Sequence, residues 1–481
     1  MKKTLLSLCL CLSSSLGLAD DFSFSLSTSQ QTEVPEIGSG VGIINKQLEL
    51  IVGEKVLRKI RFKYPLINDV WLEDQFFIIF NRLVSQTQLG EPIGLVIIRD
   101  PDINAFAQVG GVFALNAGLV ISAKNMDQVA SVMGHEIAHV TQRHFSRGNE
   151  AINGQSLLSL LGLVAGAVLA SKANVEAGTA LMYGAQALAI DNELHYSRSQ
   201  EREADRIGMQ YLYSAGYNPE GMPEFFENLQ QRYRPIGFFP DFWSTHPLTA
   251  ERMSETKLRA SQYPRIPYSN SQQDFEIIKW YLAVVSSQAT EEQLYSLASQ
   301  KNMEGLLALA KYQSIRGDYQ NAQIQLNLAK KINSEHALVT LIQTDIYLGQ
   351  NKINDAYQVI VSKQRITPEN RALSYKLAEV YIRQNKSKEA EQLVNRFINN
   401  NNRDISGWQL LQQAANLDKA NPMRTVNVLR NRSEVQYWSG DEENAIKTLL
   451  HAQRLAKENN AMSAKIEARL KVMQDEQKFK I

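Results

Sequence analysis

The chain has 481 residues, and its 51 Lys and Arg against 50 Asp and Glu give a formal net charge of +1. A charge so close to zero gives no electrostatic argument for nucleic-acid binding, and the length predicts two or three domains rather than one compact core. Both cysteines, Cys9 and Cys11, lie near the start of the chain, which excludes disulfide or thiolate chemistry in the remainder.

The first 19 residues are typical of a secretory signal peptide. Lys2 and Lys3 precede an apolar run at 5–12, and small residues follow up to Ala19, where we expect cleavage. No stretch reaches the roughly 18 to 20 uninterrupted apolar residues of a spanning helix. The sequence therefore predicts a soluble exported protein, which in a Gram-negative bacterium would be periplasmic.

A mixed pattern of helices and strands follows between residues 43 and 263. The β-branched stretch "GLVIIRD", at 94–100, predicts a short buried strand, and "GGVFALNAGLVIS", at 110–122, predicts a second strand or a hairpin with glycines at its bends. Long helical patterns surround both. Two prolines and a polar cluster at 261–273 then predict a linker.

Beyond the linker the pattern is helical and repeats. Ala322, Ala356 and Ala390 are spaced by 34 residues, the period of tetratricopeptide units. The next such alanine, Ala445, follows after 55 residues, which predicts an extra helix or a degenerate unit between 399 and 428. Twelve residues before each alanine stands another small residue, as closely crossing helices require: Ala310, Thr344, Ala378 and Ser433. The alternative is an irregular helical bundle.

The stretch "SVMGHEIAHVTQRHF", at 131–145, contains the candidate metal-binding and catalytic residues. Asn125 can cap a helix that begins at Met126, and in that helix His135 and His139 lie four residues apart on one face. Their side chains would be about 5 to 6 Å apart, so that both imidazoles could reach one zinc ion at about 2.0 to 2.1 Å. Glu136 would hold a water at the metal and accept its proton.

An HExxH motif alone is only moderately specific, and a third ligand is needed to support it. The candidate is Glu201 in "SRSQEREADRIGMQYL", at 197–212, which would complete a two-histidine, one-glutamate zinc site with an open position. Asp205, four residues later, suits a role behind the ligands, accepting a hydrogen bond from a ligand histidine. The alternative is a charged, solvated helix face. For His144 we expect a structural role or a role behind the ligands rather than metal ligation.

Two apolar stretches separate these helices, at about 156–190. The core of the first, at 157–170, would be about 21 Å long as a helix, which is shorter than the roughly 30 Å of a bilayer core. Two interpretations remain open: a buried helical hairpin that supports the site, or a lid over the cleft whose glycines favour movement.

The order HExxH, ExxAD and then an HP motif with a downstream arginine, "THPLTAERM", resembles the family of zinc metalloproteases that includes HtpX and the CAAX prenyl proteases. The signal peptide and the repeats resemble the periplasmic branch of that family. The resemblance implies a mostly helical α+β fold with a signal peptide at 1–19, a zincin-type metallopeptidase domain at 20–265 and an all-α tetratricopeptide-repeat domain at 266–481.

The resemblance also implies roles for individual residues. His135, His139 and Glu201 would bind one Zn²⁺, and Glu136 would be the general base. Arg252 would stabilise the oxyanion of the substrate carbonyl, and the substrate would add to an edge strand, which we expect at "GGVFALNAGLV".

His246, in the HP motif, has three interpretations. It is a hydrogen-bond donor in the transition state, a reversible fourth zinc ligand in a resting state, or a structural residue before Pro247. Displacing water from the metal would silence the enzyme, so we favour the fourth ligand as a means of self-inhibition.

The implied function is a periplasmic zinc endopeptidase that promotes outer-membrane β-barrel assembly and degrades misassembled outer-membrane proteins. Its repeats would form a concave surface that binds the β-barrel assembly machinery and these clients, with peripheral membrane contact at most. The alternative is a non-proteolytic chaperone or adaptor with a silent or structural zinc site. Glu136 argues against it, because a structural site has no use for a base.

Overall fold

The structure, a computed structural model, describes residues 46–478 apart from 91, 109, 145–195, 234–241, 243–244, 265 and 267–270. The expected signal peptide and the apolar stretches at 156–190 therefore lie outside the described residues. Within the described ranges, no helix is both long enough and apolar enough to span a membrane.

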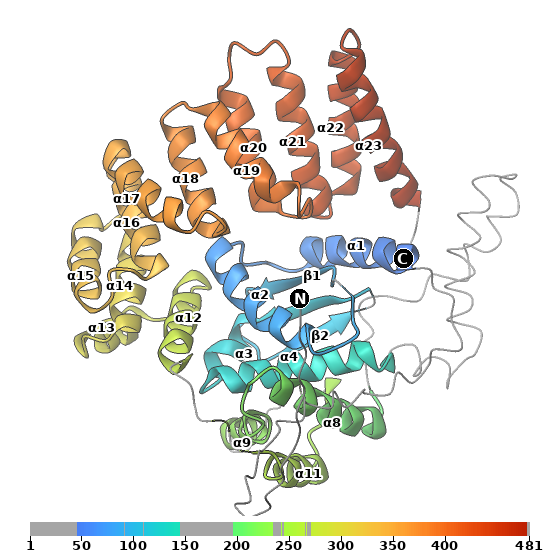
Figure 1. The fold of residues 1–481 in the computed structure, drawn as a ribbon, viewed down its shortest axis with the longest axis vertical. Helices are drawn as coiled ribbons and strands as arrows, with labels where there is room; N and C mark the ends of the chain where they lie inside the picture. The colour runs from blue at the N-terminus through green and yellow to red at the C-terminus, as the bar shows by residue number, and fades with distance from the viewer. Residues whose placement is uncertain are drawn as a thin grey trace, which may run out of the picture. The chain divides into compact units, whose positions relative to one another are not determined.

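A three-stranded sheet lies within the N-terminal part of the chain (Figure 1). Its strands are β1 (Gly94–Ile98), β2 (Ala105–Gln108) and β3 (Val112–Asn116), in the order β1-β3-β2. The central strand β3 is parallel to β1 and antiparallel to β2. Both predicted strands are confirmed. The expected edge position is wrong, because "GGVFALNAGLV" contains β3, which has a partner on each side.

Seven helices of the described chain accompany this sheet: α1 (Lys46–Lys63), α2 (Val70–Val84), α3 (Ala117–Ser122), α4 (Met126–Thr141), α8 (Arg198–Ser214), α9 (Gly221–Tyr233) and α11 (Ala250–Ala260). Helix α4 begins at the predicted residue, where the Asn125 side chain accepts a 2.9 Å hydrogen bond from the Gln128 N–H. It packs against β2 on one side and against α2, α8 and α9 elsewhere. Almost all of α4 is therefore buried, including most of its polar residues.

Helices α4 and α8 cross with their backbones in contact at Gly134 and Gly208. A Cβ atom on Gly208 would lie 2.9 Å from both the Gly134 carbonyl oxygen and the His135 nitrogen. Backbone atoms cannot move aside as a flexible side chain can, so only glycine fits at this crossing. Since His135 follows Gly134 directly, this crossing fixes how far the HExxH helix lies from the helix that carries Glu201.

The rest of the described chain is helical, as the repeat pattern predicts. All eight small residues at the repeat positions are fully buried: Ala310, Ala322, Thr344, Ala356, Ala378, Ala390, Ser433 and Ala445. The extra helix expected between 399 and 428 is α20 (Ile405–Leu417). The others are α12 (Ser271–Val285), α13 (Glu291–Ser299), α14 (Met303–Ile315), α15 (Tyr319–Ile332), α16 (Ala337–Gly349), α17 (Ile353–Ile366), α18 (Arg371–Arg383), α19 (Ser387–Ile398), α21 (Arg424–Trp438), α22 (Glu442–Leu455) and α23 (Asn460–Lys478).

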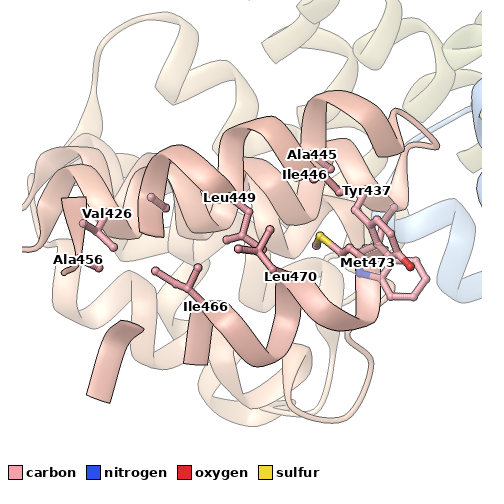
Figure 2. Packing of buried hydrophobic residues seen from close by; sticks show 11 residues of the cluster. Val426, Tyr437, Ala445, Ile446, Leu449, Ala456, Ile466, Leu470 and Met473 are labelled. Atoms are coloured by element: carbon pink, nitrogen blue, oxygen red, sulfur yellow. The ribbon is translucent and has the colours of Figure 1, made fainter. Parts of the chain in front are cut away.

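The last three helices enclose an apolar core, which Figure 2 shows from close by. Leu449 of α22 packs there with Ile466 and Leu470 of α23, and Tyr437 and Met473 lie in the same cluster without exposure. Helix α23 therefore covers the apolar side of the pair formed by α21 and α22.

Helix α1 is attached to these last helices by Arg58. Its Nε donates to Glu442 Oε1 at 2.9 Å and its Nη2 donates to Glu476 Oε2 at 2.7 Å. The guanidinium also lies 4.2 Å from the centre of the Tyr437 ring, and only 1% of the side chain is exposed. A buried arginine with two carboxylate partners ties the first described helix to the end of the repeats.

Candidate metal centre

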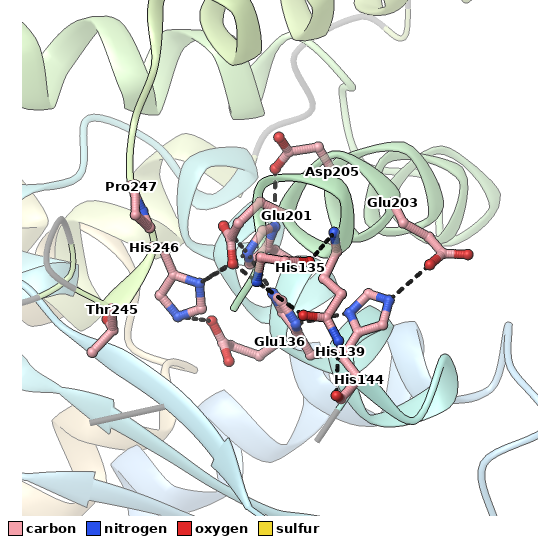
Figure 3. A network of polar contacts seen from close by, with 12 residues as sticks. His135, Glu136, His139, His144, Glu201, Glu203, Asp205, Thr245, His246 and Pro247 are labelled. Atoms are coloured by element: carbon pink, nitrogen blue, oxygen red, sulfur yellow. Dashed lines mark hydrogen bonds and ion pairs between the residues drawn. The ribbon is translucent and has the colours of Figure 1, made fainter. Parts of the chain in front are cut away.

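Four donor side chains converge between α4, α8 and the segment before Pro247, as Figure 3 shows. His135 and His139 come from α4, Glu201 comes from the first turn of α8, and His246 precedes the proline. One ligand atom from each lies within 4.8 Å of the others, and all four side chains are buried. The structure thus brings together the three predicted ligands and the suggested fourth one.

The spacing of these atoms suits a metal ion. His135 Nε2 lies 3.0 Å from His139 Nε2 and 3.3 Å from His246 Nδ1, and His246 Nδ1 lies 3.1 Å from Glu201 Oε1. Ligand atoms at about 2.0 to 2.1 Å from a tetrahedral ion are separated by about 3.3 Å. A cation held between these atoms would account for their convergence.

Glu136 lies beside the cluster with a buried carboxylate. Its Oε1 is 3.3 Å from His246 Nε2. Among the described residues no well-aligned hydrogen bond reaches either of its oxygens, although the backbone N–H of Ala107 faces the group and favours its charged form. Burial nevertheless raises the pKa of Glu136 above its ordinary value, which suits a group that accepts and returns a proton.

Behind the cluster, Asp205 and Arg252 form a buried ion pair. Arg252 donates to both Asp205 oxygens at 2.7 Å, and Asp205 Oδ1 lies 3.0 Å from His135 Nδ1. Burial alone would raise the pKa of Asp205, but Arg252 holds it below its ordinary value. Burial alone would lower the pKa of His135, but the contacts with Asp205 and Glu201 raise it to about 9.

The position of Arg252 differs from the expectation that it faces the substrate carbonyl. Its remaining guanidinium nitrogen, Nη1, lies 2.7 Å from Glu201 Oε2 and donates to the Pro247 carbonyl at 2.9 Å. All three guanidinium nitrogens therefore have acceptors within the protein. A direct oxyanion contact would require breaking these buried hydrogen bonds, so the geometry favours a role in which Arg252 holds Glu201 and the backbone of Pro247 in place.

Sequence reasoning missed two aromatic residues at the centre. The ring of Tyr196 stacks on His139 with centroids 3.8 Å apart, and the ring of Phe242 lies 4.8 Å from that of His246. Both cover histidines of the donor cluster with apolar surface. Neither belongs to a motif, and only their closeness to Glu201 and His246 along the chain could have suggested a role.

Comparison with known proteins places this arrangement in a family. Residues 74–260 match the model of Peptidase family M48, and residues 347–415 match a tetratricopeptide repeat. The chain is 31% identical to a putative β-barrel assembly-enhancing protease of Vibrio cholerae, over 91% of each chain. It is also 31% identical to the β-barrel assembly-enhancing protease of Escherichia coli K12, over 93% of this chain and 92% of the relative. The family match and the near full-length similarity agree with the buried histidine and glutamate cluster, which suits a metal ion. The chain therefore belongs to the metalloproteases of peptidase family M48.

Proposed function

We propose that the protein is a zinc endopeptidase of the bacterial periplasm that acts on outer-membrane β-barrel proteins during their assembly. The observation that carries the proposal is the buried convergence of His135, His139, Glu201 and His246 beside the buried carboxylate of Glu136. Two histidines and a glutamate are typical ligands of catalytic zinc in proteases.

In this proposal His135, His139 and Glu201 hold the zinc ion. Bound zinc would polarise the scissile carbonyl and make water more acidic. Glu136 takes the proton from the attacking water and returns it to the leaving amine, a role for which its raised pKa is suited. Asp205 orients His135, and Arg252 keeps Asp205 charged and holds Glu201 in place through its contact at 2.7 Å.

His246 restrains the enzyme at rest. Its Nδ1 lies among the ligand atoms, 3.1 Å from Glu201 Oε1, and its Nε2 lies 3.3 Å from Glu136 Oε1. With a metal bound, this one side chain would take the position that water needs, and it also contacts the base. A client that displaces His246 would free the position at the metal and the carboxylate of Glu136 at the same time.

The substrate backbone binds along β2. The Asn116 N–H donates to the Asn104 carbonyl at 3.0 Å, so in the antiparallel pair the N–H and C=O groups of the alternate residues Ala105 and Ala107 point away from β3. The Ala107 N–H faces Glu136, which supports this edge as the place where an extended peptide would pair next to the metal.

The assignment to β-barrel assembly is supported by the relatives, which are named β-barrel assembly-enhancing proteases and match this chain over nine tenths of its length. We infer that the repeats bind protein partners, among them the assembly machinery and its outer-membrane clients. The expected signal peptide, cleaved near Ala19, would deliver the protein to the periplasm.

Cleavage of an unfolded outer-membrane β-barrel protein tests this function. The purified protein is stripped with a chelator and then given one equivalent of Zn²⁺. We expect cleavage to stop on stripping and return with zinc, and His246→Ala to cleave faster than the wild type without client activation. Cleavage that persists in the stripped protein would contradict the zinc mechanism, and unchanged basal cleavage by His246→Ala would contradict the restraint.

A further inference from the structure

His144 and Glu203 lie behind the ligand His139, on the side away from the donor cluster (Figure 3). Helix α4 ends at Thr141, and Arg143 has a φ of +53°, a left-handed conformation that turns the chain sharply. The turn folds His144 back beneath the helix, where its ring centroid lies 4.9 Å from that of His139. His144 is fully buried, and burying its polar ring costs more desolvation free energy than burying an apolar side chain would.

The contacts of His144 have one consistent assignment of protons. His139 directs Nε2 at the donor cluster, 3.4 Å from Glu201 Oε1, so in a metal-binding tautomer its proton is on Nδ1. That Nδ1 lies 2.9 Å from His144 Nδ1, which therefore accepts. The proton of a neutral His144 is then on Nε2, which lies 3.0 Å from Glu203 Oε2 and donates to it.

Behind each of the two ligand histidines of α4 there is thus a carboxylate from α8. Asp205 reaches His135 directly, whereas Glu203 reaches His139 through His144. Gln200 on the same helix donates from Nε2 to the His144 carbonyl at 2.9 Å and so holds its backbone. The side chain of Glu203 is 17% exposed, so its carboxylate keeps some contact with water.

We propose that His144 and Glu203 are positioning residues that hold His139 in the tautomer and orientation required for metal binding. The inference rests on the proposed metal centre. Partners of this kind behind metal-ligating histidines typically contribute about 10- to 100-fold in metal affinity. A histidine that only filled space would contribute to folding but not specifically to metal binding.

Metal affinity measured on the full-length protein tests the proposal. His144→Phe keeps a ring but removes both hydrogen bonds, and His144→Asn keeps an acceptor for His139. Glu203→Ala removes the terminal carboxylate. Glu255→Ala is the matched control, because Glu255 lines the same surface pocket as Glu203 but pairs with Arg259. Zn²⁺ affinity comes from competition with a chelating indicator, and the absorption of the Co²⁺-loaded protein reports ligand geometry.

We expect His144→Phe and Glu203→Ala to lose about 10- to 100-fold in Zn²⁺ affinity and to alter the Co²⁺ spectrum, while His144→Asn regains part of the loss. The unfolding temperature of the metal-free Glu203→Ala protein should match that of Glu255→Ala. If His144→Phe fails to fold, the Zn²⁺ affinity of Glu203→Ala alone tests the proposal.

Wild-type affinity in Glu203→Ala, or an equal loss in Glu255→Ala, would overturn the proposal. A wild-type protein that binds no Zn²⁺ at this site would instead overturn the metal centre itself, so the two failures are distinguishable.

Discussion

Replacing Arg58 with methionine tests the attachment of α1 to the last repeats. The substitution keeps an apolar stem of similar length but removes the guanidinium and with it the hydrogen bonds from Arg58 to Glu442 and Glu476, at 2.9 and 2.7 Å. Glu442 keeps Lys55 at 3.8 Å, and Glu476 keeps the hydroxyl of Tyr437. It also removes the cation over the Tyr437 ring, at 4.2 Å. The variant therefore isolates the charged contacts from the packing of the stem.

The structure sets the expected magnitude. Removing one partner of a buried ion pair costs about 3 to 5 kcal/mol, and the lost cation–π contact is about 0.5 to 2 kcal/mol of that cost. The two glutamates remain 16% and 14% exposed, so water screens part of the penalty. We expect the lower end, about 3 kcal/mol, which corresponds to more than about a 100-fold change in an equilibrium constant.

Hydrogen exchange of the amides in α1 and in α21–α23 measures the effect locally, because loss of the contact should lower the free energy of opening for both segments. Arg403→Met is the control. Arg403 pairs with Glu54 at 2.9 Å but is 21% exposed, and we expect about 1 kcal/mol or less from it. Equal protection in the Arg58→Met variant and the wild type, or equal losses in both variants, would refute the reasoning.

Two further predictions concern the repeats and the helix crossing. Burial alone would raise the pKa of Asp345, but Lys311 and Lys376, at 2.8 and 2.7 Å, hold it well below its ordinary value. The contribution of Asp345 to stability is therefore complete above its unfolded pKa of about 4 and is lost as the pH falls below that value. Urea unfolding of Asp345→Asn between pH 7 and 3 should show a smaller loss of stability than the wild type. An unchanged pH dependence would contradict this. At the crossing, Gly208→Ala should push α8 away from α4 and so lower the Zn²⁺ affinity measured by competition with a chelator. Gly90→Ala is the control, because no atom lies within 4 Å of the added Cβ, and its affinity should match the wild type. Equal affinities of the two variants would show that the crossing does not fix the spacing of the metal ligands.

Much of the site could be predicted because its signals are local in sequence. The i, i+4 spacing of His135 and His139 depends only on helix geometry, and the Asn125 cap is set by residues three apart. The repeat positions were predictable for a similar reason, since a small residue is needed wherever two helices cross, and Ala322 and its equivalents recur at a fixed period.

What could not be predicted depends on contacts between distant segments. Strand β2 has only four residues, too few for an alternating pattern to stand out, and a sheet without β2 predicts β3 at its edge. The sequence indicates that Arg252 is near the site but not that Asp205 and Glu201 occupy its guanidinium. In the sequence, Gly208 is only a residue that is unfavourable in a helix. Its role becomes clear only from the contact with the backbone of Gly134, which lies far from it in the sequence.

The rate of peptide-bond cleavage by Glu136→Gln with its metal in place tests the central claim most directly. The substitution is nearly isosteric and leaves the ligand atoms untouched, so metal analysis should find one Zn²⁺ per chain, as in the wild type. The account predicts a loss of about 10²- to 10⁴-fold in the cleavage rate, the contribution of a general base, with Zn²⁺ content unchanged. Cleavage at the wild-type rate by the zinc-loaded variant would contradict it.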